Sequence, residues 1–321
     1  MKILIASSIH KDAIQKLEQD HDVICAFNAR DDVLKAVIPD REVLIFRSGV
    51  QITADVMSRA PDLKLILRAG SGVDNIDVDY VEERGIRLVR IPGPGAKAVA
   101  ELSFAFMLAL SRNLLKADQL TRQGHFAKSQ LTGYLLTGKT LGIIGVGNIG
   151  SRVASLGNAW GMQVVGCVEF LTPARVEAFH QQRVHLTDFK NVLQSADFIS
   201  IHVPLKTSTR YLIDAQALSH VRPEAILVNL ARGGVVDESA LLAALQESRL
   251  RGAALDVHEV EGDGKVSPLA GLPNVILTPH IGAGTFDSQR EIGEIVLRTM
   301  SEYMAEETSG AFEEAAASAV E

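Results

Sequence analysis

Short apolar runs alternate with amphipathic stretches along the whole chain. Runs of strand length occupy residues 3–6, 22–25, 43–46, 63–67, 87–89, 140–144, 163–167, 198–202, 225–229, 252–255 and 275–277. The stretches between them carry apolar residues at helical spacing, for example at 11–18, 149–160 and 238–247. Because strands that alternate with helices form parallel sheets covered on both faces, the pattern predicts an α/β fold.

Two segments interrupt this pattern and indicate domain crossings. A Pro/Gly cluster at 91–95 marks the first crossing, and a long helix at 98–123 follows it. The second crossing lies near 282–285, and a helix at 288–304 returns to the first domain. The sequence therefore predicts one domain inserted into another.

A glycine loop follows the strand at 140–144 and opens the helix after it. Gly145 permits a tight turn, Gly147 lets the backbone approach a pyrophosphate, and Gly150 lets helix and strand pack closely. A second strand at 163–167 completes the unit. This context predicts a dinucleotide site, and the alternative is a glycine turn in an ordinary α/β unit.

The position of this loop assigns a role to each domain. A substrate-binding domain is predicted at 1–96 and 286–310, and a nucleotide-binding domain at 97–285. The end of the chain is rich in Ala, Glu and Ser without a strong apolar pattern. Residues 311–321 are therefore expected to form a flexible tail.

The end of the second strand bears on cofactor choice. An acid there hydrogen-bonds the adenosine ribose in dinucleotide-binding domains. In this chain Val168 follows the strand and Glu169 comes next, while residues 168–173 contain no Arg or Lys to pair with a 2′-phosphate. This favours NAD over NADP without excluding NADP.

Three polar residues follow later strands and suit chemistry on a small 2-hydroxy or 2-oxo acid. Arg232 offers a planar fork for a carboxylate, and His280 can exchange the hydroxyl proton as hydride leaves C2. Glu261 would orient the imidazole and stabilise its charged form. The alternatives are a surface arginine, a structural histidine and a solvated loop acid, which Glu259 and Asp263 are expected to be. The neighbouring glutamate Glu259 competes with Glu261 for the role.

Arg47 and Arg68 each follow an apolar strand of the first domain. Two guanidinium groups suit a phosphate or second carboxylate on the substrate. The alternative is that they cap strand ends, and the sequence does not decide between the two interpretations.

The composition narrows the class of protein. The chain has 321 residues, 47% of them hydrophobic, and a net charge of −7, which argues against general nucleic-acid or anionic-membrane binding. Its two cysteines offer no disulfide framework and no metal-ligand spacing. The first residues are typical of a strand rather than a signal peptide, so we expect a cytoplasmic protein. The lack of metal-ligand spacing means that we expect no metal site.

Taken together, several motifs resemble the D-isomer-specific 2-hydroxyacid dehydrogenase family, of the phosphoglycerate dehydrogenase type. The resemblance lies in residues 68–75, 99–101, 145–150, 202–205, 229–238 and 278–284. It implies a flavodoxin-like substrate domain with an inserted Rossmann NAD-binding domain. It also implies a homodimer formed through the nucleotide-binding domains.

The resemblance implies roles for individual residues. Arg232 would bind the substrate carboxylate, His280 would be the acid/base, and Glu261 would orient it. Asp256 would hold the nicotinamide carboxamide. The other residues implied to bind the cofactor are Gly145, Gly147, Asn148, Ile149, Gly150, Glu169, Val203 and Leu230, and those implied to bind substrate are Arg47, Arg68, Ser71 and Gly72.

The expected reaction is hydride transfer between C2 of a 2-hydroxy acid and nicotinamide C4. The leading substrate is 3-phosphoglycerate or another phospho-, phosphono- or carboxy-substituted acid. A glyoxylate or hydroxypyruvate reductase is the alternative, and an NAD-sensing, corepressor-like binding protein is a remote one. No domain follows residue 321 in this sequence, so feedback by serine through an appended domain is not expected. The chain departs from the family pattern at Val168, at Gly95 and at Gly262, where the family carries a ribose-binding Asp, an Asn and a Pro.

Overall fold

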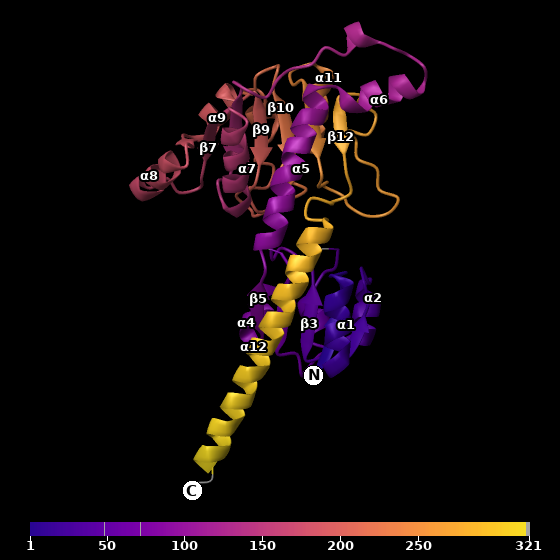
Figure 1. Ribbon diagram of the computed structural model, residues 1–321, viewed down its shortest axis with the longest axis vertical. Coiled ribbons are helices and arrows are strands. Elements are labelled where there is room, and N and C mark those ends of the chain that lie inside the picture. The colour runs from indigo at the N-terminus through magenta and orange to yellow at the C-terminus, as the bar shows by residue number, and fades with distance from the viewer. Residues whose placement is uncertain (48, 71, 319–321) are drawn as a thin grey trace. The chain divides into compact units, whose positions relative to one another are not determined.

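The computed structural model describes residues 1–47, 49–70 and 72–318, with side chains as far as Ser309. The chain divides into two compact units (Figure 1). One comprises Met1–Gly95 and Gly284–Glu321, and the other comprises Ala96–Ala283.

The first unit is built on a five-stranded parallel sheet of order β2-β1-β3-β4-β5. Its strands are β1 Lys2–Ile5, β2 Asp22–Cys25, β3 Val43–Phe46, β4 Leu65–Arg68 and β5 Arg87–Arg90. Its helices are α1 Lys11–Asp20, α2 Asp31–Val37, α3 Ala54–Met57, α4 Val78–Glu83 and α12 Phe286–Ser318. This strand order is the flavodoxin-like one, in which ligands bind beyond the carboxyl ends of the strands.

Apolar side chains cover both faces of this sheet. Every residue of β3 and β4 is buried, and alternate residues belong to different clusters, such as Leu44 to one and Ile45 to the other. Ile292, Val296 and Met300 of α12 join the second cluster at helical spacing. Burial on both faces explains why these strands are continuous apolar runs.

The second unit is built on a seven-stranded parallel sheet of order β12-β11-β10-β9-β6-β7-β8. Its strands are β6 Thr140–Ile144, β7 Gln163–Cys167, β8 His185–Leu186, β9 Phe198–Ile201, β10 Ile226–Asn229, β11 Gly252–Leu255 and β12 Val275–Leu277. Its helices are α5 Gly93–Ser111 (which begins in the first unit), α6 Leu114–Arg122, η1 Lys128–Gln130, α7 Asn148–Ala159, α8 Pro173–Gln181, α9 Phe189–Ser195, α10 Ala215–Leu218 and α11 Glu238–Gln246. Apart from the additional strand β12, this is the Rossmann strand order.

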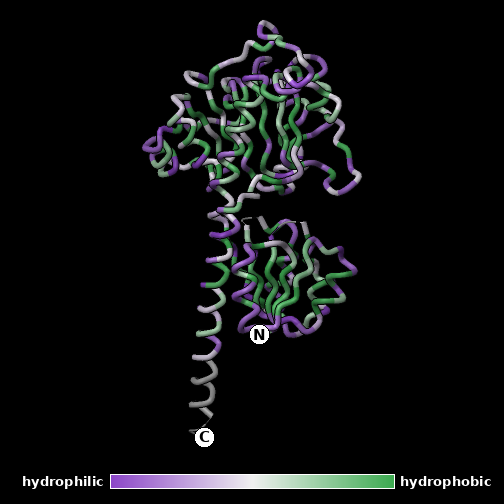
Figure 2. The backbone as a smooth tube through the Cα atoms, turned by 45° about the vertical axis from the view of Figure 1, so that its right-hand side comes forward, coloured by the Kyte–Doolittle hydropathy of each residue, from purple (hydrophilic) through white to green (hydrophobic). Residues whose placement is uncertain are grey.

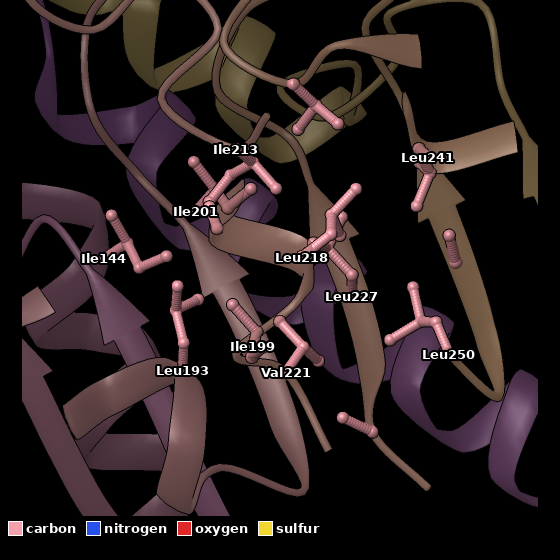
Figure 3. Packing of buried hydrophobic residues seen from close by; sticks show 14 of the residues in the cluster. Ile144, Leu193, Ile199, Ile201, Ile213, Leu218, Val221, Leu227, Leu241 and Leu250 are labelled. Carbon is pink, nitrogen blue, oxygen red and sulfur yellow. The ribbon is translucent and has the colours of Figure 1, made fainter. Parts of the chain in front are cut away.

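The core of the second unit also lies on both sides of its sheet. Figure 3 shows one side, where Ile199 and Ile201 of β9 and Leu227 of β10 pack with Leu193 of α9 and Leu218 of α10. Burying a side chain of this size stabilises a fold by about 1.5–3 kcal/mol. The backbone coloured by hydropathy shows apolar strands at the centre of each unit (Figure 2).

Side-chain caps explain where many of the helices begin. At seven N-caps of the described helices the side chain accepts a hydrogen bond from a main-chain N–H of the first turn, which satisfies a donor that the helix itself leaves unpaired. These caps are His10, Thr53, Asp77, Thr172, Asp188, Asp214 and Asp237.

The predicted α/β fold of two doubly wound parallel sheets is confirmed. The single helix predicted at 98–123 is wrong, because the chain forms α5 and α6 there with a break between them. Asn113 at the break has φ +53°, a left-handed conformation that Asn tolerates better than most residues. The two-residue strand β8 was not predicted, and residues 319–321 of the predicted tail lie outside the described residues.

Within the described residues, no single helix is long and apolar enough to cross a membrane. The helices α5 and α6 pass such a test only as a pair, and they meet at a bend of 59°.

Candidate active site

The glycine loop joins β6 to α7, and its three glycines are required for different reasons. Gly145 has φ +94°, and a Cβ there would lie 2.7 Å from the carbonyl oxygen of His202. A Cβ at Gly150 would overlap the carbonyl of Gly145. Both positions therefore need glycine for the fold itself.

Gly147 has no such structural reason. Its φ is −99°, and a Cβ there would meet no described atom within 4 Å. It is the N-cap of α7, followed by Asn148 and Ile149, and an open hollow of about 530 Å³ lies beside it. Gly147 lies at a helix N-terminus, and no described contact requires glycine there. This fits the close approach of a pyrophosphate to the backbone.

The loops after β9 and β10 emerge at the same edge of the sheet as the glycine loop. Val203 follows β9, and its Cγ1 would lie 2.8 Å from a Cβ at Gly145. Leu230 follows β10 and is buried. These placements accord with a dinucleotide lying across the carboxyl ends of the strands.

Glu169 lies just beyond β7 and is exposed. The ammonium group of Lys206, in the loop after β9, lies 3.6 Å from Oε2 of Glu169. Lys206 lies far along the sequence from residues 168–173, where a positive partner is expected, so the local pattern does not reveal it. Parallel strands bring their carboxyl ends to one edge of a sheet, and Lys206 reaches Glu169 across β6.

His280 and Glu261 form the central pair of the candidate site. Nδ1 of His280 lies 3.1 Å from Oε2 of Glu261, with the two side chains 34% and 42% exposed. Burial opposes the ionisation of Glu261, but the hydrogen bonds from His280 and from the main chain of His258 outweigh it, so the pKa of Glu261 is lowered. With Nδ1 on the carboxylate, Nε2 is the ring nitrogen of His280 that can exchange a proton with a bound molecule.

The carboxylate of Asp256 organises the turn that carries His280. Its Oδ1 accepts from the hydroxyl of Thr278 at 2.6 Å and from the N–H of Ile281 at 2.8 Å, and its Oδ2 accepts from the N–H of Gly282 at 2.7 Å. Asp256 is 1% exposed. The turn needs this support because His280 itself has φ +54°, in the sparsely populated left-handed region.

Two residues of the Glu261 loop have contacts that the sequence pattern does not predict. Glu259 is expected to be a solvated loop acid, but it is bound to Glu238 and to the hydroxyl of Tyr211. His258 carries no local signal of a role. Its ring nitrogen Nε2 lies 2.9 Å from the carbonyl oxygen of Thr278.

Arg232 lies on a turn directly after β10. Asn229 fixes this turn, because its side chain accepts from the N–H of Ala231 at 3.0 Å and donates to the carbonyl of Arg232 at 3.1 Å. A Cβ at the next residue, Gly233, would overlap the carbonyl of His258. Glycine therefore lets the arginine turn pack against the loop that carries Glu261.

The family proline at position 262 is incompatible with this backbone. Gly262 has φ +123°, whereas proline is fixed near −65°. Gly264 also has a positive φ, of +75°, and the N–H of Lys265 returns to the carbonyl of Gly262 at 3.2 Å. The turn after Glu261 therefore needs glycine at the position where the family carries proline.

Arg47 and Arg68 lie at one edge of the sheet in the first unit. Phe46 and Arg68 are partners in the β3–β4 register, and Arg47 is the next residue after β3. Arg68 is 6% exposed, with its guanidinium 5.6 Å from the centre of the Phe46 ring, and burial lowers the pKa of Arg47. Gly72 lies beyond the same edge, while Ser71 lies outside the described residues.

Among the residues that the structure describes, no group of three or more His, Cys, Asp or Glu side chains could hold a metal ion.

Comparison with known proteins adds to this geometry. Residues 104–282 match the family model described as "D-isomer specific 2-hydroxyacid dehydrogenase, NAD binding domain". The chain is 42% identical to D-3-phosphoglycerate dehydrogenase of Methanocaldococcus jannaschii over 296 residues, which cover 92% of this chain and 56% of that protein. It therefore spans about half the length of that relative.

Two other relatives match over almost their whole length. Hydroxypyruvate reductase of Thermotoga maritima is 38% identical over 306 residues, covering 94% of this chain and 98% of that protein. The crystal structure of D-lactate dehydrogenase from Aquifex aeolicus, complexed with NAD and lactic acid, is 29% identical. It matches with a TM-score of 0.85 and covers 96% of this chain and 97% of that one.

Proposed function

The chain belongs to the D-isomer specific 2-hydroxyacid dehydrogenase family, and from this premise we propose that it is an NAD-dependent dehydrogenase of 2-hydroxy acids. The observation that carries the proposal is the His280–Glu261 pair, 3.1 Å apart, in the same unit as the glycine loop. A proton-exchanging group and a dinucleotide site are the two requirements for hydride transfer at a CH–OH carbon.

The candidate site residues of the second unit each have a part in the proposed mechanism. The nicotinamide cofactor supplies the hydride acceptor or donor when bound. His280 takes the hydroxyl proton at Nε2 during oxidation and returns it during reduction, since its Nδ1 is held by Glu261. Arg232 binds the substrate carboxylate with two parallel hydrogen bonds, which orients C2. Asp256 holds the turn of His280 and, in our proposal, meets the nicotinamide carboxamide as well.

We propose 3-phosphoglycerate, or another acid with a second anionic group, as the leading substrate. Arg47 and Arg68 support this choice, because two guanidinium groups at one sheet edge suit a phosphate. The similarity to a D-3-phosphoglycerate dehydrogenase supports it too. Reduction of hydroxypyruvate or glyoxylate is the second candidate, because the Thermotoga maritima hydroxypyruvate reductase matches over 98% of its own length.

The test is a panel of 2-oxo acids assayed with NADH and with NADPH. It contains phosphohydroxypyruvate, hydroxypyruvate, glyoxylate and pyruvate. We expect the highest kcat/KM with phosphohydroxypyruvate and NADH. A preference for hydroxypyruvate or glyoxylate would move the second candidate to first place. Binding of NADH without turnover of any acid would favour the corepressor-like alternative.

We also propose a cytoplasmic homodimer formed through the second units. Large apolar side chains are exposed along residues 114–135 of that unit, namely Leu114, Leu115, Phe126, Tyr134 and Leu135. Such a row is typical of a covered surface. Light scattering on the wild type and on Leu135→Glu tests it, with a dimer expected for the former and weaker association for the latter. Both cysteines are free, which suits the reducing cytoplasm, and cell fractionation tests that location.

A further inference from the structure

His258 is bonded to both sides of the His280–Glu261 pair. Its main-chain N–H donates to Oε1 of Glu261 at 3.2 Å, and its ring nitrogen Nε2 lies 2.9 Å from the carbonyl oxygen of Thr278. The same carbonyl accepts the main-chain N–H of His280 at 3.1 Å. One residue thus holds the carboxylate through its backbone and the turn of the acid/base through its ring.

The chemistry of the two atoms fixes the direction of the ring bond. A carbonyl oxygen can only accept, so Nε2 of His258 carries the proton. A carbonyl has two lone pairs, which allows Thr278 to serve both histidines at once. The other ring nitrogen, Nδ1, is buried and has no hydrogen-bond partner among the described residues. The ring therefore has one directional contact, and that contact is with the turn of His280.

The His280–Glu261 pair needs such a contact because both side chains are partly exposed to water. An exposed ion pair contributes little on its own, since water screens the charges and the side chains lose freedom. Fixing the backbone on both sides removes part of that entropic cost. Among the described residues, Glu261 is hydrogen-bonded to the imidazole of His280, and Asp256 and His258 are hydrogen-bonded to its turn. Glu259 is bound to Glu238 instead.

We propose that His258 is a positioning residue of the proposed dehydrogenase reaction: its ring holds the Thr278–His280 turn so that the imidazole of His280 stays on Glu261. The inference rests on the proposed function for its meaning in catalysis. The positioning itself is a property of the unliganded protein and can be measured without turnover.

Two variants of His258 isolate the ring bond. His258→Phe keeps a ring of similar size and removes the donor, whereas His258→Gln keeps an N–H near the position of Nε2. For His258→Phe we expect the descending limb of the pH profile for reduction to move by about half a pH unit or more to lower pH, as it does when an imidazolium loses its anionic partner. We expect kcat to fall about threefold or more, with the Kd for NADH unchanged. His258→Gln should restore the wild-type profile.

A double-mutant cycle and a direct titration complete the experiment. In a Glu261→Gln background, His258→Phe should cause little further shift, since the pair is already lost. Histidine carbon NMR, with His280 assigned from a His280→Ala spectrum, should show the same shift of its titration midpoint. An unmoved midpoint in folded His258→Phe, or full additivity with Glu261→Gln, would overturn the proposal. Absence of turnover in the wild type would instead count against the proposed function and leave the NMR result intact.

Discussion

Glu238 and Glu259 each hold the main chain of the other. Oε1 of Glu238 accepts from the N–H of Glu259 at 2.7 Å, and Oε1 of Glu259 accepts from the N–H of Glu238 at 2.9 Å. Glu238 is buried at the start of α11 and also accepts the hydroxyl of Ser267 at 2.8 Å. Glu259 is thus committed to its own loop, and Glu261 alone of the two neighbouring glutamates contacts His280.

This difference predicts opposite results for the two glutamates. Glu261→Gln should move the descending limb of the reduction pH profile to lower pH, because the imidazolium loses its anionic partner. Glu259→Gln should lower thermal stability and leave that limb in place. The lowered pKa of Glu261 determines how the His280–Glu261 pair responds to acid. The pair is intact above the ordinary carboxyl range and is lost as pH falls through that lowered pKa. A limb that moves only in Glu259→Gln would reverse the assignment.

Arg232→Lys tests carboxylate binding. Lysine keeps the positive charge but cannot form two parallel bonds to a carboxylate. A charge-assisted hydrogen bond is worth about 1.5–3 kcal/mol, so kcat/KM should fall roughly tenfold or more. The Kd for NADH, measured by fluorescence titration, is the control and should stay constant. Wild-type kinetics in a folded Arg232→Lys variant would remove Arg232 from the substrate site.

Sequence reasoning succeeds where a local pattern determines the structure. The parallel strands are continuous apolar runs because both sheet faces are buried, as β3 and β4 show. The glycine loop was recognisable because the positive φ of Gly145 and the contact of Gly150 with the carbonyl of Gly145 both lie within one strand–turn–helix unit. Local patterns of this kind extend over only a few residues on either side.

The same reasoning fails where a contact joins distant segments. The bond between His258 and the carbonyl of Thr278 depends on the pairing of β11 with β12, and the approach of Lys206 to Glu169 depends on the order of β9, β6 and β7. Neither the pairing of β11 with β12 nor the order of β9, β6 and β7 can be inferred from the spacing of residues along the sequence. The break at Asn113 was missed for another reason, because the apolar pattern of a helix continues across a single left-handed residue.

Substitution of Arg47 or Arg68 tests the choice of substrate. If both bind a distal anion, Arg47→Ala should raise KM for phosphohydroxypyruvate about tenfold or more, since a desolvated phosphate loses a charge-assisted bond. Arg68 packs on Phe46, so Arg68→Met keeps much of its apolar contact while removing the charge. Glyoxylate has no distal group, and its KM should change little in either variant.

A matched control for these arginine variants is Arg30→Ala, in the same unit. Arg30 pairs with Asp32 at 3.1 Å on the surface, with its side chain 83% exposed, and should affect neither substrate. Equal losses on phosphohydroxypyruvate and glyoxylate in the Arg47 and Arg68 variants would mean that both arginines act on the shared carboxylate or on the fold.

His202 should make the protein sensitive to acid. Burial lowers the pKa of His202 to about 3, from an ordinary value of 6.5, and its Nε2 lies 2.8 Å from the hydroxyl of buried Ser200. A histidine with a lowered pKa contributes stability that is present above pH 6.5 and is lost as pH falls toward 3, because only the unfolded chain takes up the proton. The slope for one such group approaches about 1.4 kcal/mol per pH unit.

His202→Phe should therefore flatten the dependence of the unfolding free energy on pH between 6.5 and 4.5, as measured by urea denaturation at several pH values. Other groups also titrate in this range, so the informative quantity is the difference in unfolding free energy between variant and wild type. The slope of that difference against pH should correspond to the uptake of up to one proton on unfolding. His125 is exposed, and His125→Asn should run parallel to the wild type. If His202→Phe also runs parallel, His202 takes up its proton in the folded protein at the same pH as in the unfolded chain, and burial does not lower its pKa.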